Sequence, residues 1–158
     1  STLHHLVRSK PVRVVTHLAE GVQMDSYPGP LGQVLNNLYN NALIHGFAGR
    51  ERGEIIVETR REGGDQVVLE VRDDGNGIAE ENLRKVFDPF FTTRLGQGGS
   101  GLGLNIVHNI VTQLLGGRIV AESPPGCGAT FRMVLPLLAP DVVRNPWAPA
   151  GPGQESGK

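Results

Sequence analysis

Residues 87–104 read FDPFFTTRLGQGGSGLGL, so three phenylalanines stand directly before a stretch dense in glycine. Five glycines fall within eight positions, at 96, 98, 99, 101 and 103, and a helical pattern begins where they end. Glycine loses more conformational freedom on folding than any other residue, so a glycine-rich loop is costly to order. Such a loop between an apolar anchor and a helix indicates backbone that must come close to a ligand.

The segment at the end of this loop, GLNIVHNIVTQLLGG, predicts an amphipathic helix. Its apolar residues recur on one face, at Leu104, Val107, Ile110, Val111 and Leu114. Backbone N–H groups at a helix start, together with the helix dipole, suit a phosphate group. The loop does not fit the Walker pattern, and it does not follow a strand as a dinucleotide fingerprint does. Taken alone, it fits a flexible hinge as well as a phosphate site.

A second helix is predicted upstream, within PGPLGQVLNNLYNNALIHGF at residues 28–47. Pro30 suits the start of this helix and Gly46 suits its end. The spacing of its apolar residues follows a helical stripe, formed by Leu31, Val34, Leu35, Leu38 and Ala42.

Four asparagines interrupt this helix, although asparagine is a poor helix former. Asn37, Asn41 and His45 follow one edge of the apolar stripe, whereas Asn36 and Asn40 are expected to point to solvent. Carboxamide oxygens at such an edge can coordinate a hard cation. A polar helix edge that caps nearby loops is the alternative, and the spacing alone favours that alternative.

The turn DDGNG follows the apolar strand QVVLEV. Asp73 stands at the strand end, and Gly75 and Gly77 follow it. On its own this pattern is typical of a solvated turn. The functional interpretation is a buried Asp73 carboxylate that accepts a hydrogen bond from a ligand's amino group. Gly75 and Gly77 would then let the ligand lie against the backbone.

The remaining segments predict mainly hairpins. Residues 54–75 form one hairpin around the turn EGGD, residues 118–137 form another around PPGCG, and IAEENLRKVF is a short helix. PVRVVTHLAEGVQMDSY contains one strand and a second short extended segment. We therefore predict an α+β two-layer sandwich, in which three helices cover one face of a mixed, mostly antiparallel sheet of about five strands.

The domain is expected to span residues 10–138. Residues 1–9 are interpreted as the end of a preceding helix, because the chain starts without methionine inside a helical pattern. Residues 139–158, rich in proline and glycine, are interpreted as a disordered tail or linker. The sequence thus predicts part of a longer protein.

Composition excludes several classes of function. The net charge of −1 argues against a domain built mainly to coat nucleic acid or an anionic membrane. The single cysteine, Cys127, excludes an internal disulfide framework and a cysteine-rich zinc site. No apolar run approaches the roughly 20 residues that span a bilayer, and no signal peptide is visible. We expect a cytoplasmic domain, whose parent protein is compatible with a membrane anchor.

Taken together and in order, these motifs resemble the catalytic ATP-binding domain of bacterial two-component sensor histidine kinases. This domain belongs to the superfamily of gyrase, Hsp90, histidine kinase and MutL ATPases and has the Bergerat-type fold. QVLNNLYNNALIH resembles its N box, VRDDGNGI its G1 box, VFDPFFTT its F box and GSGLGL its G2 box. GCGATFRMVLP resembles its closing glycine-rich strand. The resemblance covers roughly residues 10–138.

The resemblance implies ATP and Mg²⁺ as cofactors. Asn41 would ligate Mg²⁺, Asn37 would support the metal and phosphates, and Arg94 could reach the γ-phosphate as a third catalytic residue. Asp73 would accept from the adenine amino group, with a water network held by Thr130. Phe87, Phe90 and Phe91 would anchor a lid at 92–101 that is mobile without nucleotide. The implied cofactor-binding set is Asn37, Asn41, His45, Asp73, Gly75, Gly77, Ile78, Phe87, Gly101, Leu102, Gly103, Leu104 and Thr130.

The resemblance also implies partners. The phosphoacceptor histidine would lie outside this sequence, in a dimerisation helix pair of the same parent protein, with a response regulator downstream. The full-length protein would be a homodimer and this piece a monomer, with no nucleic-acid or direct membrane contact. One departure is Ile44, where many family members carry a lysine. A protein serine kinase of the same superfamily and a nucleotide-binding module with degenerate catalysis remain as alternatives.

Overall fold

The computed structural model describes residues 12–19, 28–91 and 103–138. Within these ranges the strands form a five-stranded sheet in the order β1-β2-β3-β5-β4, in which β1 is parallel to β2 and the other pairs are antiparallel. The elements are β1 (Val12–His17), α2 (Pro28–Asn41), the π-helical turn η1 (Ala42–Gly46), β2 (Gly53–Glu62), β3 (Gln66–Asp73), α3 (Glu80–Leu83), α4 (Gly103–Asn109), the π-helical turn η2 (Ile110–Leu114), β4 (Arg118–Glu122) and β5 (Ala129–Pro136).

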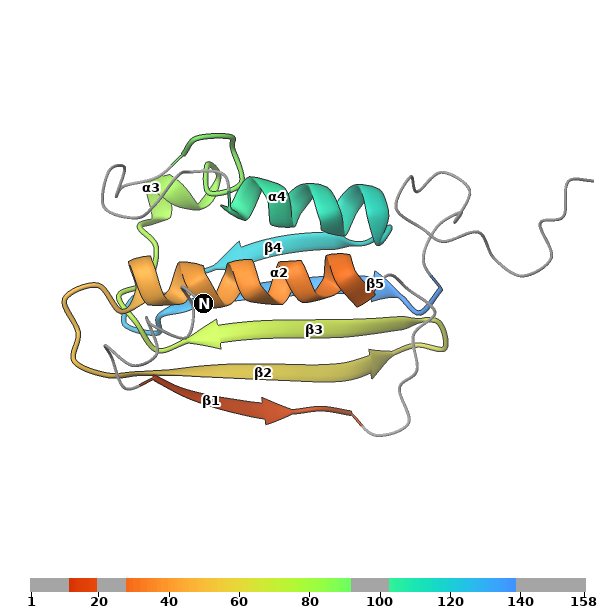
Figure 1. The fold of residues 1–158 in the computed structure, drawn as a ribbon, viewed down its shortest axis with the longest axis horizontal. Coiled ribbons are helices and arrows are strands. Elements are labelled where there is room, and N and C mark those ends of the chain that lie inside the picture. Colours follow the sequence, from red (N-terminus) through yellow and green to blue (C-terminus); the bar gives the residue numbers. More distant parts are fainter. Residues whose placement is uncertain (1–11, 20–27, 92–102, 139–158) are drawn as a thin grey trace, which may run out of the picture.

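This architecture confirms the predicted α+β sandwich, its mixed sheet and its three helices. α2 and α4 contact each other over one face of the sheet (Figure 1). The expectations for residues 1–9 and 139–158, and most of the second extended segment, lie outside the described residues. No helix in the described ranges is long and apolar enough to cross a membrane.

The apolar stripe of α2 is the part of that helix that is buried. Val34, Leu38 and Ala42 are at most 3% exposed, and the helix begins at Pro28, two residues before the predicted start. α3 is shorter than predicted, because the segment after Leu83 continues as a run of turns. That run brings Val86 into the interior, where it is 5% exposed.

The pleat of β3 sorts its side chains onto the two faces of the sheet. Val67, Leu69 and Val71 face the helices and belong to the hydrophobic core. Asp73 is the next residue in that row, so it ends an apolar series on the covered face and is itself 8% exposed. Its neighbour across the sheet in β5 is Ala129, which is also buried.

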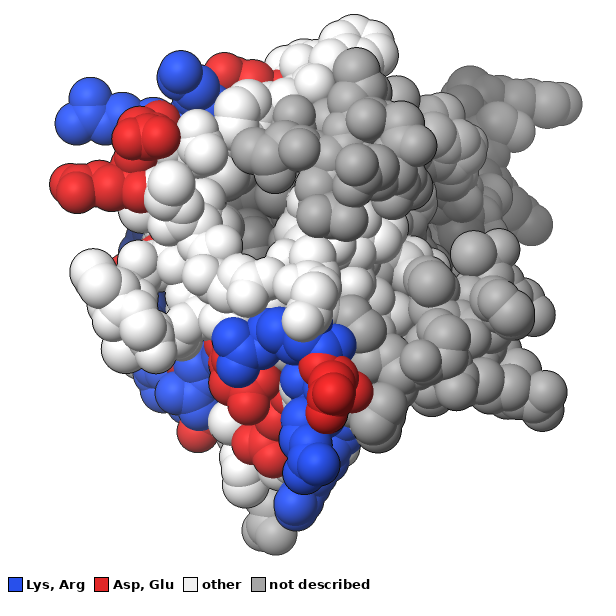
Figure 2. Space-filling view, turned by 90° about the vertical axis from the view of Figure 1, so that its left-hand side faces the viewer, with Lys and Arg blue, Asp and Glu red and all other residues white. Residues whose placement is uncertain are grey.

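The opposite face of the sheet carries a ladder of ion pairs across four strands. Arg60 Nη1 and Arg132 Nε both donate to Glu70 Oε1, at 3.0 Å and 2.8 Å. Arg132 also donates to both carboxylate oxygens of Glu122, and Arg72 pairs with Glu58. Figure 2 shows basic and acidic side chains interspersed along the lower part of the end view.

We expect Glu70→Gln to lower the free energy of unfolding by about 1–2 kcal/mol near neutral pH, because the acceptor of two hydrogen bonds from arginine loses its negative charge. The two arginines lower the pKa of Glu70, Arg132 contributing most. The stabilisation is therefore present above the unfolded pKa, near 4.5, and is lost as the pH falls through the folded pKa. Chemical denaturation of both proteins at several pH values measures this difference.

Glu62→Gln provides the control, since Glu62 is an exposed residue at the end of β2. Its unfolding free energy should stay close to that of the wild type. A Glu70→Gln protein as stable as the wild type at pH 7 would contradict the role given to the ladder.

Candidate functional site

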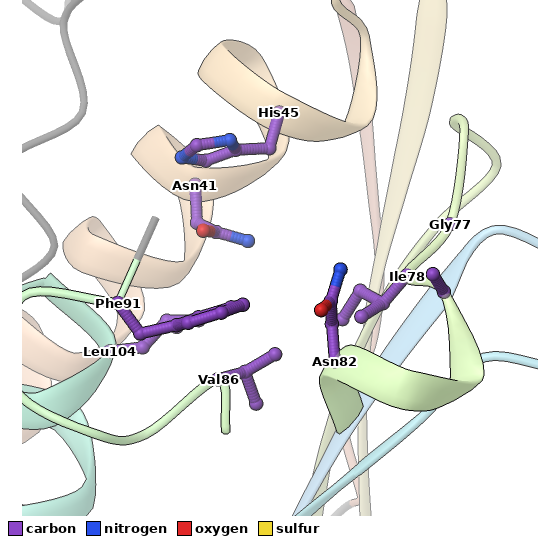
Figure 3. Close-up of a pocket in the computed structure, with 9 residues that line it drawn as sticks. Asn41, His45, Gly77, Ile78, Asn82, Val86, Phe91 and Leu104 are labelled. Carbon is purple, nitrogen blue, oxygen red and sulfur yellow. The ribbon is translucent and has the colours of Figure 1, made fainter. Parts of the chain in front are cut away.

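Three stretches far apart in the sequence, at 41–45, 77–91 and Leu104, line one open cavity of about 170 Å³. The end of α2 with η1 forms one wall, the loop after β3 and α3 form the facing wall, and the start of α4 closes a third side (Figure 3). The lining residues are Asn41, His45, Gly77, Ile78, Ala79, Asn82, Val86, Phe91 and Leu104.

Asp73 lies where the loop after β3 meets η1. Its Oδ1 accepts hydrogen bonds from the backbone N–H of Gly75 (2.9 Å) and of Ala129 (3.3 Å). Burial raises the pKa of Asp73 above its ordinary value, and the two N–H donors oppose that shift. The carboxylate is so close to Gly46 that a Cβ at that position would lie 3.2 Å from it.

The loop of residues 74–77 is fastened to the end of the helix by Asn76. Its backbone N–H donates to the Gly46 carbonyl (2.7 Å), and its Nδ2 donates to the carbonyls of Ala48 (2.8 Å) and His45 (3.3 Å). A Cβ at Gly75 would lie 2.1 Å from the Gly46 carbonyl oxygen, so this close approach requires glycine. Glycine at position 75 is therefore required by the packing of this loop against Gly46, and Gly75 is not among the residues that line the cavity.

Asn41 and Asn37 play different roles in this geometry. The Asn41 side chain points into the cavity (Figure 3), and its carboxamide has no hydrogen-bond partner among the described residues. Asn37 Nδ2 donates to the Gly103 carbonyl (3.3 Å), so it joins α2 to the start of α4. Asn36 is exposed as expected, whereas Asn40 is half-buried.

The expectation that Thr130 holds water beside Asp73 is wrong. Thr130 pairs with Arg72 across the β3–β5 ladder, and Ala129 pairs with Asp73. Paired residues place their side chains on the same face and successive residues alternate, so Thr130 faces away from Asp73. Ala129 is the β5 residue that contacts the carboxylate, through its backbone N–H.

The phenylalanines of the F box separate into different environments. The Phe87 ring packs against His108 (5.4 Å between centroids) and Phe131 (6.3 Å), and Asn105 Nδ2 holds its carbonyl at 3.0 Å. Phe91 lines the cavity. Phe90 is 71% exposed with φ of 64°, so the prediction that it anchors the lid is wrong.

Several cavity residues were not predicted from sequence. Ala79, Asn82, Val86 and Phe91 all line it. Asn82 and Val86 stand four apart in the segment 78–87 that was predicted as a helix, and nothing in the sequence distinguishes them from its other residues. Asn82 points into the cavity from α3 (Figure 3).

The predicted phosphate-binding end is described only in part. Gly103 begins α4 and Leu104 lines the cavity, but Arg94, Gly101, Leu102 and the lid at 92–101 lie outside the described residues. Within the described ranges no group of three or more His, Cys, Asp or Glu side chains could hold a metal ion. A cation here would depend on neutral oxygen ligands such as the Asn41 carboxamide.

Known proteins are similar to this chain in sequence and in fold. The family described as histidine kinase-, DNA gyrase B- and HSP90-like ATPases matches residues 27–139. The sensor histidine kinase ZraS of Salmonella typhi is 47% identical over 112 residues, which cover 71% of this chain and 23% of that protein. The alginate biosynthesis sensor protein KinB of Pseudomonas aeruginosa is 43% identical over 105 residues, covering 66% of this chain and 17% of that protein.

Solved structures agree with the sequence relatives. The catalytic domain of the histidine kinase ThkA superposes with a TM-score of 0.72 at 29% identity, over 87% of this chain and 86% of that one. Full-length ShkA in complex with AMPPNP superposes with a TM-score of 0.66 at 25% identity, over 85% of this chain and 27% of that one. The chain therefore spans about a quarter or less of the curated relatives above, and it belongs to the histidine kinase-, DNA gyrase B- and HSP90-like ATPases as a catalytic domain of the sensor histidine kinase type.

Proposed function

We propose that this domain binds MgATP and donates the γ-phosphate to a histidine outside this sequence, in a dimerisation helix pair of its parent protein. The observation that carries the proposal is the buried Asp73 carboxylate, which holds the loop whose Gly77 and Ile78 line the cavity. On the facing wall lies the Asn41 carboxamide, which has no hydrogen-bond partner among the described residues. An adenine nucleotide with its metal needs two polar groups, one at each end. The base needs an acceptor for its amino group, and the metal at the phosphates needs a neutral oxygen ligand.

Asp73 is proposed to recognise the amino group of adenine. Both hydrogen bonds that the described residues make to this carboxylate end on Oδ1, which leaves Oδ2 to accept from a ligand. A carboxylate is an acceptor only, so it favours an amino group over a carbonyl oxygen at the same place. Gly77 and Ile78 on the cavity wall would lie against the base.

Mg²⁺ fits the opposite wall of the cavity. Hard cations prefer oxygen ligands and readily keep several waters, so one carboxamide oxygen from Asn41 is an adequate protein contribution. The Asn37 amide nitrogen donates to Gly103, and its oxygen, which accepts no hydrogen bond from the described residues, would support the metal or its water. The bound metal would neutralise charge on the phosphates.

The identity of these groups also limits the chemistry. Asn37 and Asn41 are amides without useful basicity near neutral pH, so neither can deprotonate a water or a serine hydroxyl. A neutral imidazole already carries a lone pair for attack. In the transfer, a bond forms between the histidine nitrogen and the γ-phosphorus, and the bond from that phosphorus to the bridging oxygen of ADP breaks.

The wider assignment follows the relatives. The parent protein is proposed to be a homodimer that passes the phosphoryl group from its histidine to an aspartate of a response regulator. The domain is proposed to lie in the cytoplasm. The mixed charges of the described surface suit contact with protein rather than nucleic acid.

Asp73→Asn should weaken ATP binding about 10- to 100-fold, because the charged acceptor is replaced by an amide with half its acceptor capacity. Calorimetric titration with MgATP measures the dissociation constants. Asp65→Asn is the matched control, since Asp65 is exposed in the turn before the other end of β3. Equal affinities of wild type and Asp73→Asn would remove Asp73 from the site.

Asn41→Ala should abolish most of the Mg²⁺-dependent part of ATP affinity. The affinity of the wild type for ATP should fall when EDTA replaces Mg²⁺, whereas the affinity of the variant should change little, because its metal has lost a protein ligand. Asn36→Ala, an exposed asparagine on the same helix, should behave like the wild type. An unaltered response to Mg²⁺ in Asn41→Ala would exclude this residue as a ligand.

Labelled ATP should give negligible hydrolysis and no self-phosphorylation with this chain alone, because no described Asp or Glu lines the cavity. Adding the helix pair with its histidine, in cis or in trans, should produce an acid-labile phosphoprotein. Rapid hydrolysis by the chain alone would contradict the role given to Asn37. An acid-stable product would indicate a serine kinase instead.

A further inference from the structure

Ser123 joins two loops through a single hydroxyl group. It directly follows β4, and its Oγ accepts a hydrogen bond from the backbone N–H of Ile78 (2.8 Å). The same Oγ donates to the carbonyl of Gly128 (2.6 Å). Ile78 lies 45 positions away in the chain, so this contact fixes the distance between two segments that the sequence separates widely.

Each of the two segments contributes to the candidate base site. Ile78, together with Gly77, forms part of the cavity wall (Figure 3). Gly128 precedes Ala129, whose N–H donates to Asp73 Oδ1. Ser123 itself does not line this cavity, so it acts on a ligand only through these two segments.

The space around the hydroxyl leaves little freedom. A Cβ at Gly77, where φ is 78°, would lie 2.7 Å from Ser123 Oγ, and a Cβ at Gly128 would lie 2.0 Å from the Asp73 carbonyl oxygen. The loop after β3, the Ser123 side chain and the turn before β5 are therefore in direct contact. A displacement of any one of these three parts would therefore displace the other two.

The two backbone groups held by Ser123 lie outside the regular elements. Ile78 stands between β3 and α3, and Gly128 stands just before β5. Backbone groups without a helix or strand partner need a side chain or water to satisfy them. Ser123 satisfies one donor and one acceptor at once, which water would do with less definite geometry.

From these contacts we propose that Ser123 is a positioning residue for adenine recognition. Its hydroxyl sets the Gly77–Ile78 wall relative to the Gly128–Ala129 backbone that holds the Asp73 carboxylate. The proposal rests on the proposed function, because it assigns to Ser123 the alignment that lets Asp73 meet the amino group of the base. Hydrogen bonds weaken steeply with distance and angle. A small displacement of these two segments would therefore selectively weaken the hydrogen bond between Asp73 and the amino group of the base.

The test compares two nucleotides on the full 158-residue chain: MgATP and the triphosphate of purine riboside, which lacks the exocyclic amino group. Ser123→Ala should weaken ATP binding about 5- to 10-fold and binding of the analogue about 2-fold at most, so the preference for ATP falls. Ser123→Thr keeps the hydroxyl and should restore the preference. Calorimetric titration measures both affinities, and thermal unfolding measures stability separately.

Two further variants sharpen the result. Ser123→Cys keeps the shape of the side chain with a weak hydrogen-bonding group, so it should lower the preference and carries the test if Ser123→Ala does not fold. Thr112→Val is the matched control. It removes a hydroxyl that donates to the His108 carbonyl (2.8 Å) on a helix, at a position that does not line the cavity. It should leave the preference for ATP intact.

If Ser123 has a purely structural role, Ser123→Ala will weaken the binding of both nucleotides equally or change only thermal unfolding. Either outcome overturns the proposal. An unchanged preference in both Ser123→Ala and Ser123→Cys overturns the role of Ser123 while leaving the nucleotide site in place. A wild-type chain that binds neither nucleotide would overturn the proposed function, and this inference with it.

Discussion

A single buried carboxylate, at the end of an apolar row on the covered face of the sheet, constrains much of this molecule. Removing a charge from water is costly unless hydrogen bonds compensate for the loss. Asp73 receives two backbone N–H donors, from Gly75 in the loop after β3 and from Ala129 at the start of β5. A Cβ at Gly46 would lie 3.2 Å from this carboxylate, and a Cβ at Gly128 would lie 2.0 Å from the Asp73 carbonyl oxygen. The conformations of three segments are therefore coupled to one ionisable group.

The register of the sheet makes the core and the site one structure. Asp73 shares the helix-facing row with Val67, Leu69 and Val71, and burial of these residues against α2 and α4 fixes which face each strand presents. A slip of one residue in β3 would send Asp73 to the face that carries Glu70 and would bring charged residues into the core. The apolar residues that stabilise the fold thus also determine where the candidate base-reading group lies.

The sequence was sufficient for features with a local period or a dense motif. The α2 stripe, both hairpins and the order of the boxes predicted the fold and placed Asn41, Gly77 and Leu104 at the cavity. The sequence was insufficient where the position of a side chain depends on the pairing register of distant strands or on one backbone angle. Thr130 was assigned by motif, although the β3–β5 pairing turns it away. The exposure of Phe90, with its positive φ, has no signal in a run of phenylalanines.

The site loops are held together in a different way from the sheet. Their positions depend on side chains that bond to distant backbone: Asn76 to the end of η1, Ser123 to two loops, and Asn105 to the F box. One neutral hydrogen bond contributes only about 1 kcal/mol to stability, far less than a buried apolar side chain. Such contacts can therefore change with little effect on folding while they reposition recognition groups. Of the cavity residues missed from sequence, Ala79, Val86 and Phe91 lie outside the helices and strands, where no periodic pattern indicates which side chains face a cavity.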